Sequence, residues 1–182
     1  RFAAFYLVTP LLVLAAILGG LAATFQVGNR IAESSLTNAI FLGNIEEVRQ
    51  QLENGADVNR RGERGWTDIS MAIYARKSEA LEVMLEYDPD LTTRSDDGQS
   101  LLWAAAWISD AECARLLLEH GATKTLEPDD LDVIQEALTQ PYEIAATQIR
   151  EYLPVQSKKD YLDNRKRIRQ LLRDAGVVPG GP

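Results

Sequence analysis

A 33-residue spacing runs through the middle of the chain and constrains its fold more than any other feature. Gly55 in "NGADVN" recurs as Gly121 in "HGATK", 66 residues later, which is twice 33. Self-similarity at a fixed period predicts stacked copies of one small unit, because a single copy cannot bury its apolar face alone. Other sets of similar residues recur at the same 33-residue spacing, and we call each set a column. The columns are Leu52, Leu85 and Leu118; Ala39, Ala72 and Ala105; Leu36, Ile69 and Leu102; Gly65 and Gly98; and Thr67 and Ser100.

Each copy predicts two short helices joined by a tight turn. The alanine column favours close helix packing, and the leucines from Leu116 to Leu118 supply interior side chains from the second helix. Gly55 and Gly121 come directly after that helix. A left-handed residue commonly ends a helix, and glycine adopts that conformation without steric cost. The sequence therefore predicts an all-α solenoid.

Three consecutive copies carry this pattern: "SSLTNAIFLGNIEEVRQQLENGADVN", "RGWTDISMAIYARKSEALEVMLEYDPDL" and "DGQSLLWAAAWISDAECARLLLEHGATK". Over about residues 32–124 they resemble the ankyrin repeat, whose signature is roughly G-x-T-P-L-H-x-A-A followed by a leucine-rich helix and G-A-D-V-N. The resemblance implies an ankyrin-repeat solenoid in which Cys113 is buried on a second helix. The sequence departs from this signature at two positions. The proline is replaced by Ser35, Asp68 and Leu101 in the three copies, and the histidine by Thr37, Ser70 and Trp103.

A fourth, diverged copy follows. "QPYEIAATQ" resembles the start of a repeat, with Pro141 beginning the helix and Ala145 in the alanine column, and "RIRQLLRDAGV" resembles the leucine helix. "PDDLDVIQEAL" predicts an added helix with Asp129 or Asp130 as its N-cap, and about nine extra residues around "EYLPVQSKK" separate the two halves. The predicted domains are a membrane anchor over residues 1–28, repeats one to three over 29–126, the diverged fourth repeat over 127–176 and a tail over 177–182.

The first segment is apolar throughout. No charged residue occurs from Phe2 to Asn29, and "FAAFYLVTPLLVLAAILGGLAATF" is 24 residues long. About 20 helical residues cross a bilayer's hydrocarbon core, whereas the apolar region of a signal peptide, the alternative, is about 7–15 residues long. We therefore predict a single transmembrane helix in the cell (inner) membrane. Small residues spaced four apart would let a partner helix approach closely, and this ridge consists of Ala15, Ala16, Gly19, Gly20 and Ala23.

The orientation of this helix is poorly determined by charge, because Arg1 flanks one end and Arg30 the other. The net charge of the chain is −8. This acidic character favours a repeat domain on the periplasmic side, with the N-terminus in the cytoplasm. It also argues against nucleic acid as a partner, because phosphate contacts need a basic surface.

Motifs that carry catalysis or bind cofactors are missing from the sequence. It has no glycine-rich phosphate loop, and its single cysteine and single histidine exclude a disulfide within the chain and a multi-histidine metal site. Asp96 and Asp97 are paired, but they occupy a predicted hairpin tip rather than a desolvated pocket, which paired catalytic carboxylates need. We therefore expect a protein that is not an enzyme and that needs no cofactor or metal.

The resemblance to ankyrin repeats implies that a partner protein meets the concave face, formed by hairpin tips and first helices. Phe41, Tyr74 and Trp107 are 33 residues apart, so stacking would align them as an aromatic stripe. Exposed aromatic side chains are typical of binding anchors. Alternatively, the rings lean between the helices and complete the core, which is the role we expect for Trp103. The predicted contacts on this face are Phe41, Arg64, Trp66, Tyr74, Asp96, Asp97, Gln99, Trp107 and Ile108.

A basic segment lies near the end of the chain. Residues 157–173 hold seven basic side chains against Asp160 and Asp163. The pattern is typical of a solvated helix face. An alternative is contact with anionic lipid headgroups or an acidic partner.

Together these features predict a non-catalytic, membrane-anchored protein that mediates protein–protein interaction, as an accessory or scaffold subunit of a membrane complex. Its predicted partners are a protein on the concave face, a transmembrane helix, and membrane lipid. The alternative function is that of an immunity protein, which binds and blocks a toxin outside the cytoplasm.

Overall fold

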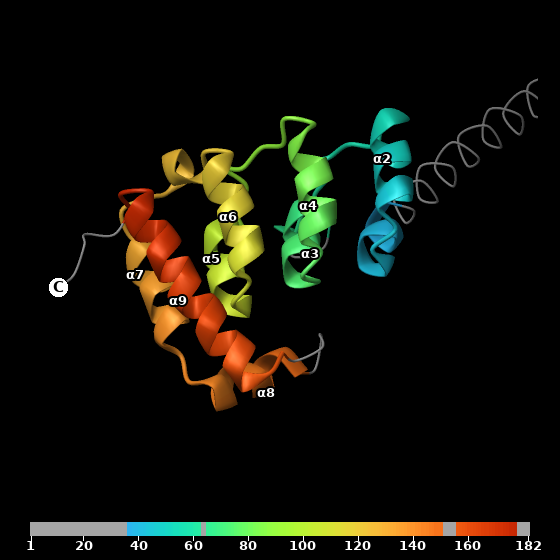
Figure 1. Ribbon diagram of the computed structural model, residues 1–182. Helices are drawn as coiled ribbons and strands as arrows, with labels where there is room; N and C mark the ends of the chain where they lie inside the picture. Colours follow the sequence, from blue (N-terminus) through green and yellow to red (C-terminus); the bar gives the residue numbers. More distant parts are fainter. Residues whose placement is uncertain (1–35, 63–64, 151–155, 178–182) are drawn as a thin grey trace, which may run out of the picture. The chain divides into compact units, whose positions relative to one another are not determined.

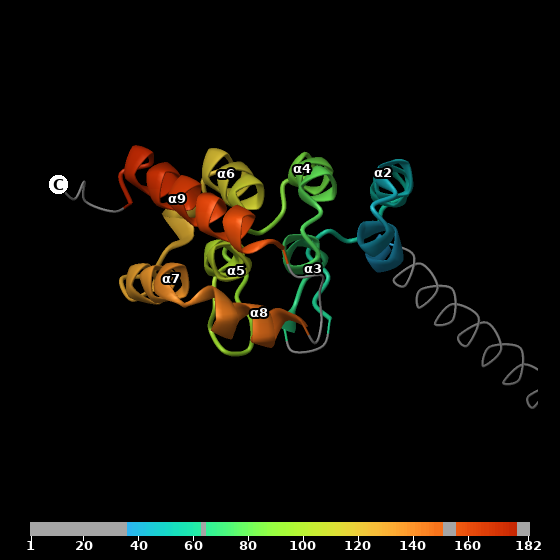
Figure 2. The ribbon, with the colours of Figure 1, turned by 60° about the horizontal axis from the view of Figure 1, so that its bottom comes forward.

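The computed structural model describes residues 36–62, 65–150 and 156–177, which form two rows of helices (Figure 1). In Figure 2 one row holds α3, α5 and α7, and the other holds α2, α4, α6 and α9. The bounds are α2 (Ile45–Glu53), α3 (Asp68–Tyr74), α4 (Ser78–Leu85), α5 (Leu101–Ile108), α6 (Ala111–Glu119), the 3₁₀ helix η2 (Ala122–Thr125), α7 (Asp130–Thr139), α8 (Tyr142–Arg150) and α9 (Lys158–Asp174). Residues 36–42 are also helical. The prediction of an all-helical architecture is confirmed.

The Thr67 and Ser100 column marks the starts of the first helices. The Thr67 hydroxyl accepts a hydrogen bond from the Ser70 backbone N–H at 3.3 Å, and the Ser70 hydroxyl accepts one from the Thr67 N–H at 2.9 Å. Ser100 accepts from the Trp103 N–H at 3.2 Å. These side chains satisfy N–H groups that lack partners in the first turn of a helix. The 33-residue repeat of hydroxyl residues is therefore a repeat of N-caps.

A second column sets the turn between the two helices of each repeat. Gly43, Arg76 and Ser109 are 33 residues apart and all adopt left-handed backbone, with φ of 68°, 56° and 57°. Only the first is glycine, so Arg76 and Ser109 carry a steric cost that glycine avoids. Arg76 gains in return two hydrogen bonds from its guanidinium to the carbonyl oxygens of Ile108 and Ser109 in the next repeat. The strained turn is thus tied to its neighbour.

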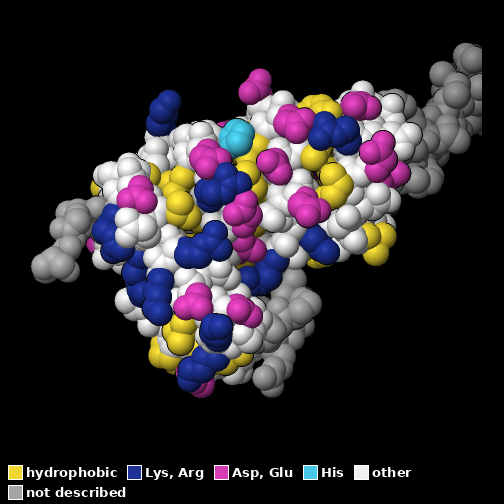
Figure 3. Space-filling model, in the orientation of Figure 1, with side chains coloured by type: hydrophobic (Ala, Val, Ile, Leu, Met, Phe, Trp, Pro, Cys, Tyr) yellow, Lys and Arg dark blue, Asp and Glu magenta, His cyan; other side chains and the backbone are white. Residues whose placement is uncertain are grey.

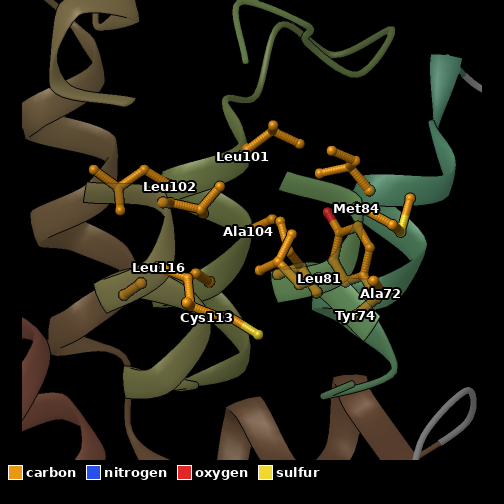
Figure 4. Close-up of a cluster of buried hydrophobic side chains, with 14 of the residues drawn as sticks. Ala72, Tyr74, Leu81, Met84, Leu101, Leu102, Ala104, Cys113 and Leu116 are labelled. Atoms are coloured by element: carbon orange, nitrogen blue, oxygen red, sulfur yellow. The ribbon is translucent and has the colours of Figure 1, made fainter. Parts of the chain in front are cut away.

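The core lies between the two helix rows. Ala72, Ala104 and Cys113 are buried in it, together with larger side chains such as Leu81 and Met84 (Figure 4). The predicted burial of Cys113 is confirmed, and burial raises the pKa of its thiol well above the usual value. Small residues at the alanine column let α3 and α5 approach each other, which stacks the repeats in register.

The fourth unit is built differently from the sequence prediction. α7 lies beside α5, and α9 lies beside α6, so these two helices continue the two rows (Figure 2). The expectation that the helix after Pro141 would be the first helix of this unit is wrong. Ile134, Ala137 and Leu138 of α7 are buried, which gives that helix the apolar face that packs in the row. α8 is the insertion and contacts α5 and α9.

The predicted membrane anchor, residues 1–28, lies outside the described residues, as do Ala15, Ala16, Gly19, Gly20 and Ala23. Within the part of the chain that the structure describes, no helix combines the length and the apolar character needed to span a bilayer.

Candidate protein-binding surface

Four aromatic rings meet in series along the row of first helices. Trp66 stacks on Tyr74 with 4.5 Å between ring centroids, and Tyr74 meets the edge of Trp107 at 6.1 Å. Trp107 stacks on Trp103 at 5.8 Å with an interplanar angle of 14°. Trp66 precedes the N-cap of α3 and Tyr74 ends that helix, while Trp103 and Trp107 are four residues apart on α5 and so share one face. We name these four residues the aromatic series.

The prediction of Tyr74 and Ile108 as exposed contacts is wrong. Tyr74 is only 8% exposed, and its ring lies among the buried side chains between α3 and α5 (Figure 4). Burial raises its pKa to about 12, with a smaller contribution from the charge of Asp97. Ile108 is 0% exposed. The alternative, in which rings at this position complete the core, describes Tyr74, because Trp66 and Trp107 cover it from two sides.

The stripe also does not extend to Phe41. Its side chain is 42% exposed, and Leu42 beside it is 80% exposed. Among the described residues, no ring pair joins Phe41 to Tyr74. Phe41 and the aromatic series are therefore separate features. Trp66, Trp103 and Trp107 are partly buried and pack against the core while keeping some surface accessible.

The hairpin tip before α5 places charged side chains next to the aromatic series. Asp96 and Asp97 are exposed, and Gln99 is partly buried, with its N–H donating to the Ser95 hydroxyl at 3.2 Å. The negative charge of Asp97 contributes to the raised pKa of Tyr74, after the larger effect of burial. Arg64, in the preceding tip, lies outside the described residues.

Ion pairs that the sequence analysis missed hold the hairpins in place. Arg94 donates to both carboxylate oxygens of Asp130 on α7, at 2.8 and 2.6 Å, and to the carbonyl of Thr125 at 3.2 Å. These bonds hold the pKa of Asp130 below its usual range. Bidentate arginine–carboxylate pairs fix both distance and orientation. The tip that carries Asp96 and Asp97 is therefore fixed against the fourth unit.

The preceding hairpin has an equivalent link. The buried carboxylate of Asp68 accepts a hydrogen bond from the Thr37 hydroxyl at 2.7 Å and from the Arg60 guanidinium at 3.1 Å. Its pKa is nevertheless raised, because burial outweighs these bonds. Asp68 occupies the proline position of the repeat signature, and that departure was the one signal in the sequence for this link.

A cleft opens between α5 and α7 beside the aromatic series. Its volume is about 510 Å³. Trp103 and Trp107 line one side, and residues of α7 with the chain after it line the other. The lining residues are Gln99, Trp103, Trp107, Val133, Glu136, Ala137, Thr139, Gln140 and Pro141.

The basic segment, residues 157–173, presents fewer free charges at the surface than its sequence suggests. Arg165 is only 3% exposed, and Arg169 donates to the carbonyl of Leu138, so neither is a free surface charge. Lys and Arg side chains gather along α9 in Figure 3. The exposed ones are Lys158, Lys159, Lys166, Arg167 and Arg173, of which Lys158 pairs with Glu143 and Lys166 with Asp163.

The described residues hold no cluster of histidine, cysteine or acidic side chains that could bind a metal. His120 follows α6, and its Nδ1 lies 2.8 Å from the carbonyl oxygen of Leu116. This contact gives the histidine a structural role at a helix end.

The two helix rows and the hairpin tips define a solenoid of stacked repeats, each made of two helices joined by a turn. A family model for ankyrin repeats matches residues 36–128 in three copies, just over half of the 182-residue chain. The chain belongs to the ankyrin-repeat family, as the sequence resemblance predicted, and such repeats mediate protein–protein interaction. Comparison with curated proteins found no significant match.

Proposed function

We propose that this chain is a non-catalytic adaptor that binds another protein through its first-helix row. The observation that carries the proposal is the position of three partly accessible tryptophans, Trp66, Trp103 and Trp107, on one face beside a cleft and an acidic hairpin tip. Tryptophan is enriched among residues that dominate binding energy, and such residues act from pockets that exclude water. The core beneath them holds the face rigid, which lowers the entropy lost on binding.

We further propose that residues 1–28 anchor this adaptor in a membrane, where it serves as an accessory or scaffold subunit of a larger complex. The support for this proposal is the uncharged apolar segment from Phe2 to Asn29. Its small-residue ridge would pack against a transmembrane helix of the same complex.

The test of binding is affinity capture with the full chain in mild detergent. Trp107→Ala should remove most of the captured partner, because the indole bridges the core and the cleft. The matched control is Leu162→Ala, which removes an exposed apolar side chain from α9, a helix of the other row (Figure 2). Equal capture by both variants would refute the proposed surface.

The test of anchoring is separate. The full chain should sediment with membranes and resist extraction by salt, whereas a variant lacking residues 1–28 should not. Gly19→Leu should keep the chain in the membrane while releasing a partner helix. Recovery of the full chain from the soluble fraction would exclude an anchor without affecting the binding surface. The identity of the captured protein would then separate a complex subunit from a toxin.

A further inference from the structure

We propose that the cleft between α5 and α7 binds an arginine side chain of the partner protein. This inference rests on the proposed function and names the chemistry that the cleft selects. It follows from two features of the cleft, its aromatic wall and its charge. A contact between an arginine and an aromatic ring elsewhere in the chain supports it.

The aromatic wall consists of two nearly parallel indoles. Trp103 and Trp107 are 5.8 Å apart with an interplanar angle of 14°, and both line the cleft. Trp107 is held in place by its T-shaped contact with Tyr74 and by packing against Ala145 and Tyr161. Indoles attract cations at their faces through the ring quadrupole, and tryptophan does so most strongly among aromatic side chains. The two rings therefore form a fixed platform for a flat cation.

The charge around the cleft is negative. Glu136 lines it, and no lysine or arginine is among the described residues that do. Asp96 and Asp97 are exposed on the hairpin tip before Gln99 but do not line the cleft, and the Asp96 carboxylate lies beside Gly65, as does the Arg61 guanidinium. A cation entering the cleft would therefore meet the exposed carboxylate of Glu136, which makes no ion pair with the described residues.

Arginine fits this combination better than lysine. Its guanidinium is planar, stacks on aromatic rings, and donates two parallel hydrogen bonds to a carboxylate. It is also more weakly hydrated than an ammonium, so entry into a cleft costs less desolvation. The chain itself shows the aromatic half of this arrangement: the guanidinium carbon of Arg165 lies 4.1 Å from the centre of the Tyr161 ring. A cleft of about 510 Å³ has room for one such side chain and its flanking backbone.

The test uses the full chain in detergent, labelled with 5-fluorotryptophan, and short capped peptides as probes. The chain has three tryptophans, so three ¹⁹F signals are expected, and Trp66→Phe and Trp107→Phe assign them. The peptide acetyl-Gly-Arg-Gly-amide should shift the signals of Trp103 and Trp107 and leave that of Trp66 unchanged. The matched peptide with citrulline, which is neutral but similar in shape, should bind at least tenfold more weakly, and the lysine peptide several-fold more weakly.

A pair of protein variants tests the charge. Glu136→Gln should weaken binding of the arginine peptide about fivefold, whereas Glu82→Gln, which neutralises an exposed carboxylate on α4, should leave it unchanged. Equal binding of the arginine and citrulline peptides, or no shift with the arginine peptide at 20 mM, would overturn this inference. If the arginine inference failed in this way but Trp107→Ala still abolished capture of the partner protein, the proposed binding surface would stand. If Trp107→Ala left capture intact, the proposed function would fail whatever the peptides showed.

Discussion

Arg165 reaches from α9 into the turn after α5, where its Nε donates a hydrogen bond of 2.9 Å to the hydroxyl oxygen of Ser109. The same guanidinium donates to the carbonyl oxygens of Ala137, Leu138 and Gln140 at the end of α7. No carboxylate among the described residues pairs with it, and burial lowers its pKa. The carbonyls at the C-terminal end of a helix carry partial negative charge, so they stabilise a buried cation. One side chain therefore joins three helices.

Arg165→Lys should destabilise the chain by about 2–4 kcal/mol, because an ammonium cannot reach all four acceptors and leaves buried carbonyls unsatisfied. The measurement is urea unfolding of the full chain followed by circular dichroism. Arg167→Lys, two residues further on the exposed side of α9, should change stability by less than about 0.5 kcal/mol. Similar losses in the two variants would show that the network around Ser109 contributes little.

Asp130→Asn should destabilise the chain by about 1–3 kcal/mol at neutral pH, because it weakens a bidentate pair with Arg94. The folded state lowers the pKa of Asp130, so its contribution is present above the unfolded pKa and is lost as the pH falls through the folded value. The difference in melting temperature between the wild type and Asp130→Asn should therefore shrink as the pH falls from 7 toward 3. Asp129→Asn is the matched control, because the exposed Asp129 side chain makes no capping bond. A constant difference across this range would contradict the assignment.

Tyr74→Ala should cost about 3–5 kcal/mol of stability, because it removes a buried ring and leaves a cavity. Tyr74→Phe should cost less than about 1 kcal/mol, since it keeps the ring between Trp66 and Trp107. Melting curves of the two variants check both values. A mild effect of Tyr74→Ala would mean that the ring is a surface feature after all, as the aromatic stripe assumed.

Asp88→Gly should stabilise the chain by about 0.5–1 kcal/mol, because Asp88 is exposed and holds a left-handed φ of 47° where the first and third repeats have glycine. Arg76→Gly relieves similar strain at φ 56° but removes the bonds to Ile108 and Ser109, so it should be destabilising by about 1–2 kcal/mol. Chemical denaturation of both variants gives the signs. Stabilisation by Arg76→Gly would show that backbone strain outweighs the link between repeats.

Periodicity predicted the parts of the fold that each repeat decides locally. The hydroxyl column at Thr67 and Ser100 became the N-caps, and the alanine column became the close contact between helices, because each depends only on its place within one unit. The fourth unit was harder. Pro141 does precede a helix, but whether α7 or α8 joins the row depends on which helix offers a continuous apolar face to α5, and both have one in the sequence.

In the candidate surface, too, the sequence predicted what depends on position within one repeat but not what depends on contacts with other segments. The spacing of Tyr74 and Trp107 correctly placed both rings on the row of first helices. It could not give their depth, because burial of Tyr74 depends on Trp66, which comes from a hairpin rather than from the repeating column. The link from Asp68 to Thr37 and the pair of Arg94 with Asp130 were missed because these partners lie 31 and 36 residues apart, in neighbouring units.

Arginines link the second unit to the third and the third to the fourth: Arg61 bonds the backbone of Arg94, Arg76 bonds the end of α5, and Arg94 bonds Asp130. Solenoids often melt in stages, since each module touches only its neighbours. Here a unit that unfolds alone would leave a guanidinium, or the acceptor of one, without its partner in the neighbouring folded unit. Partial opening is thereby penalised, and the assembly should come apart in one concerted transition.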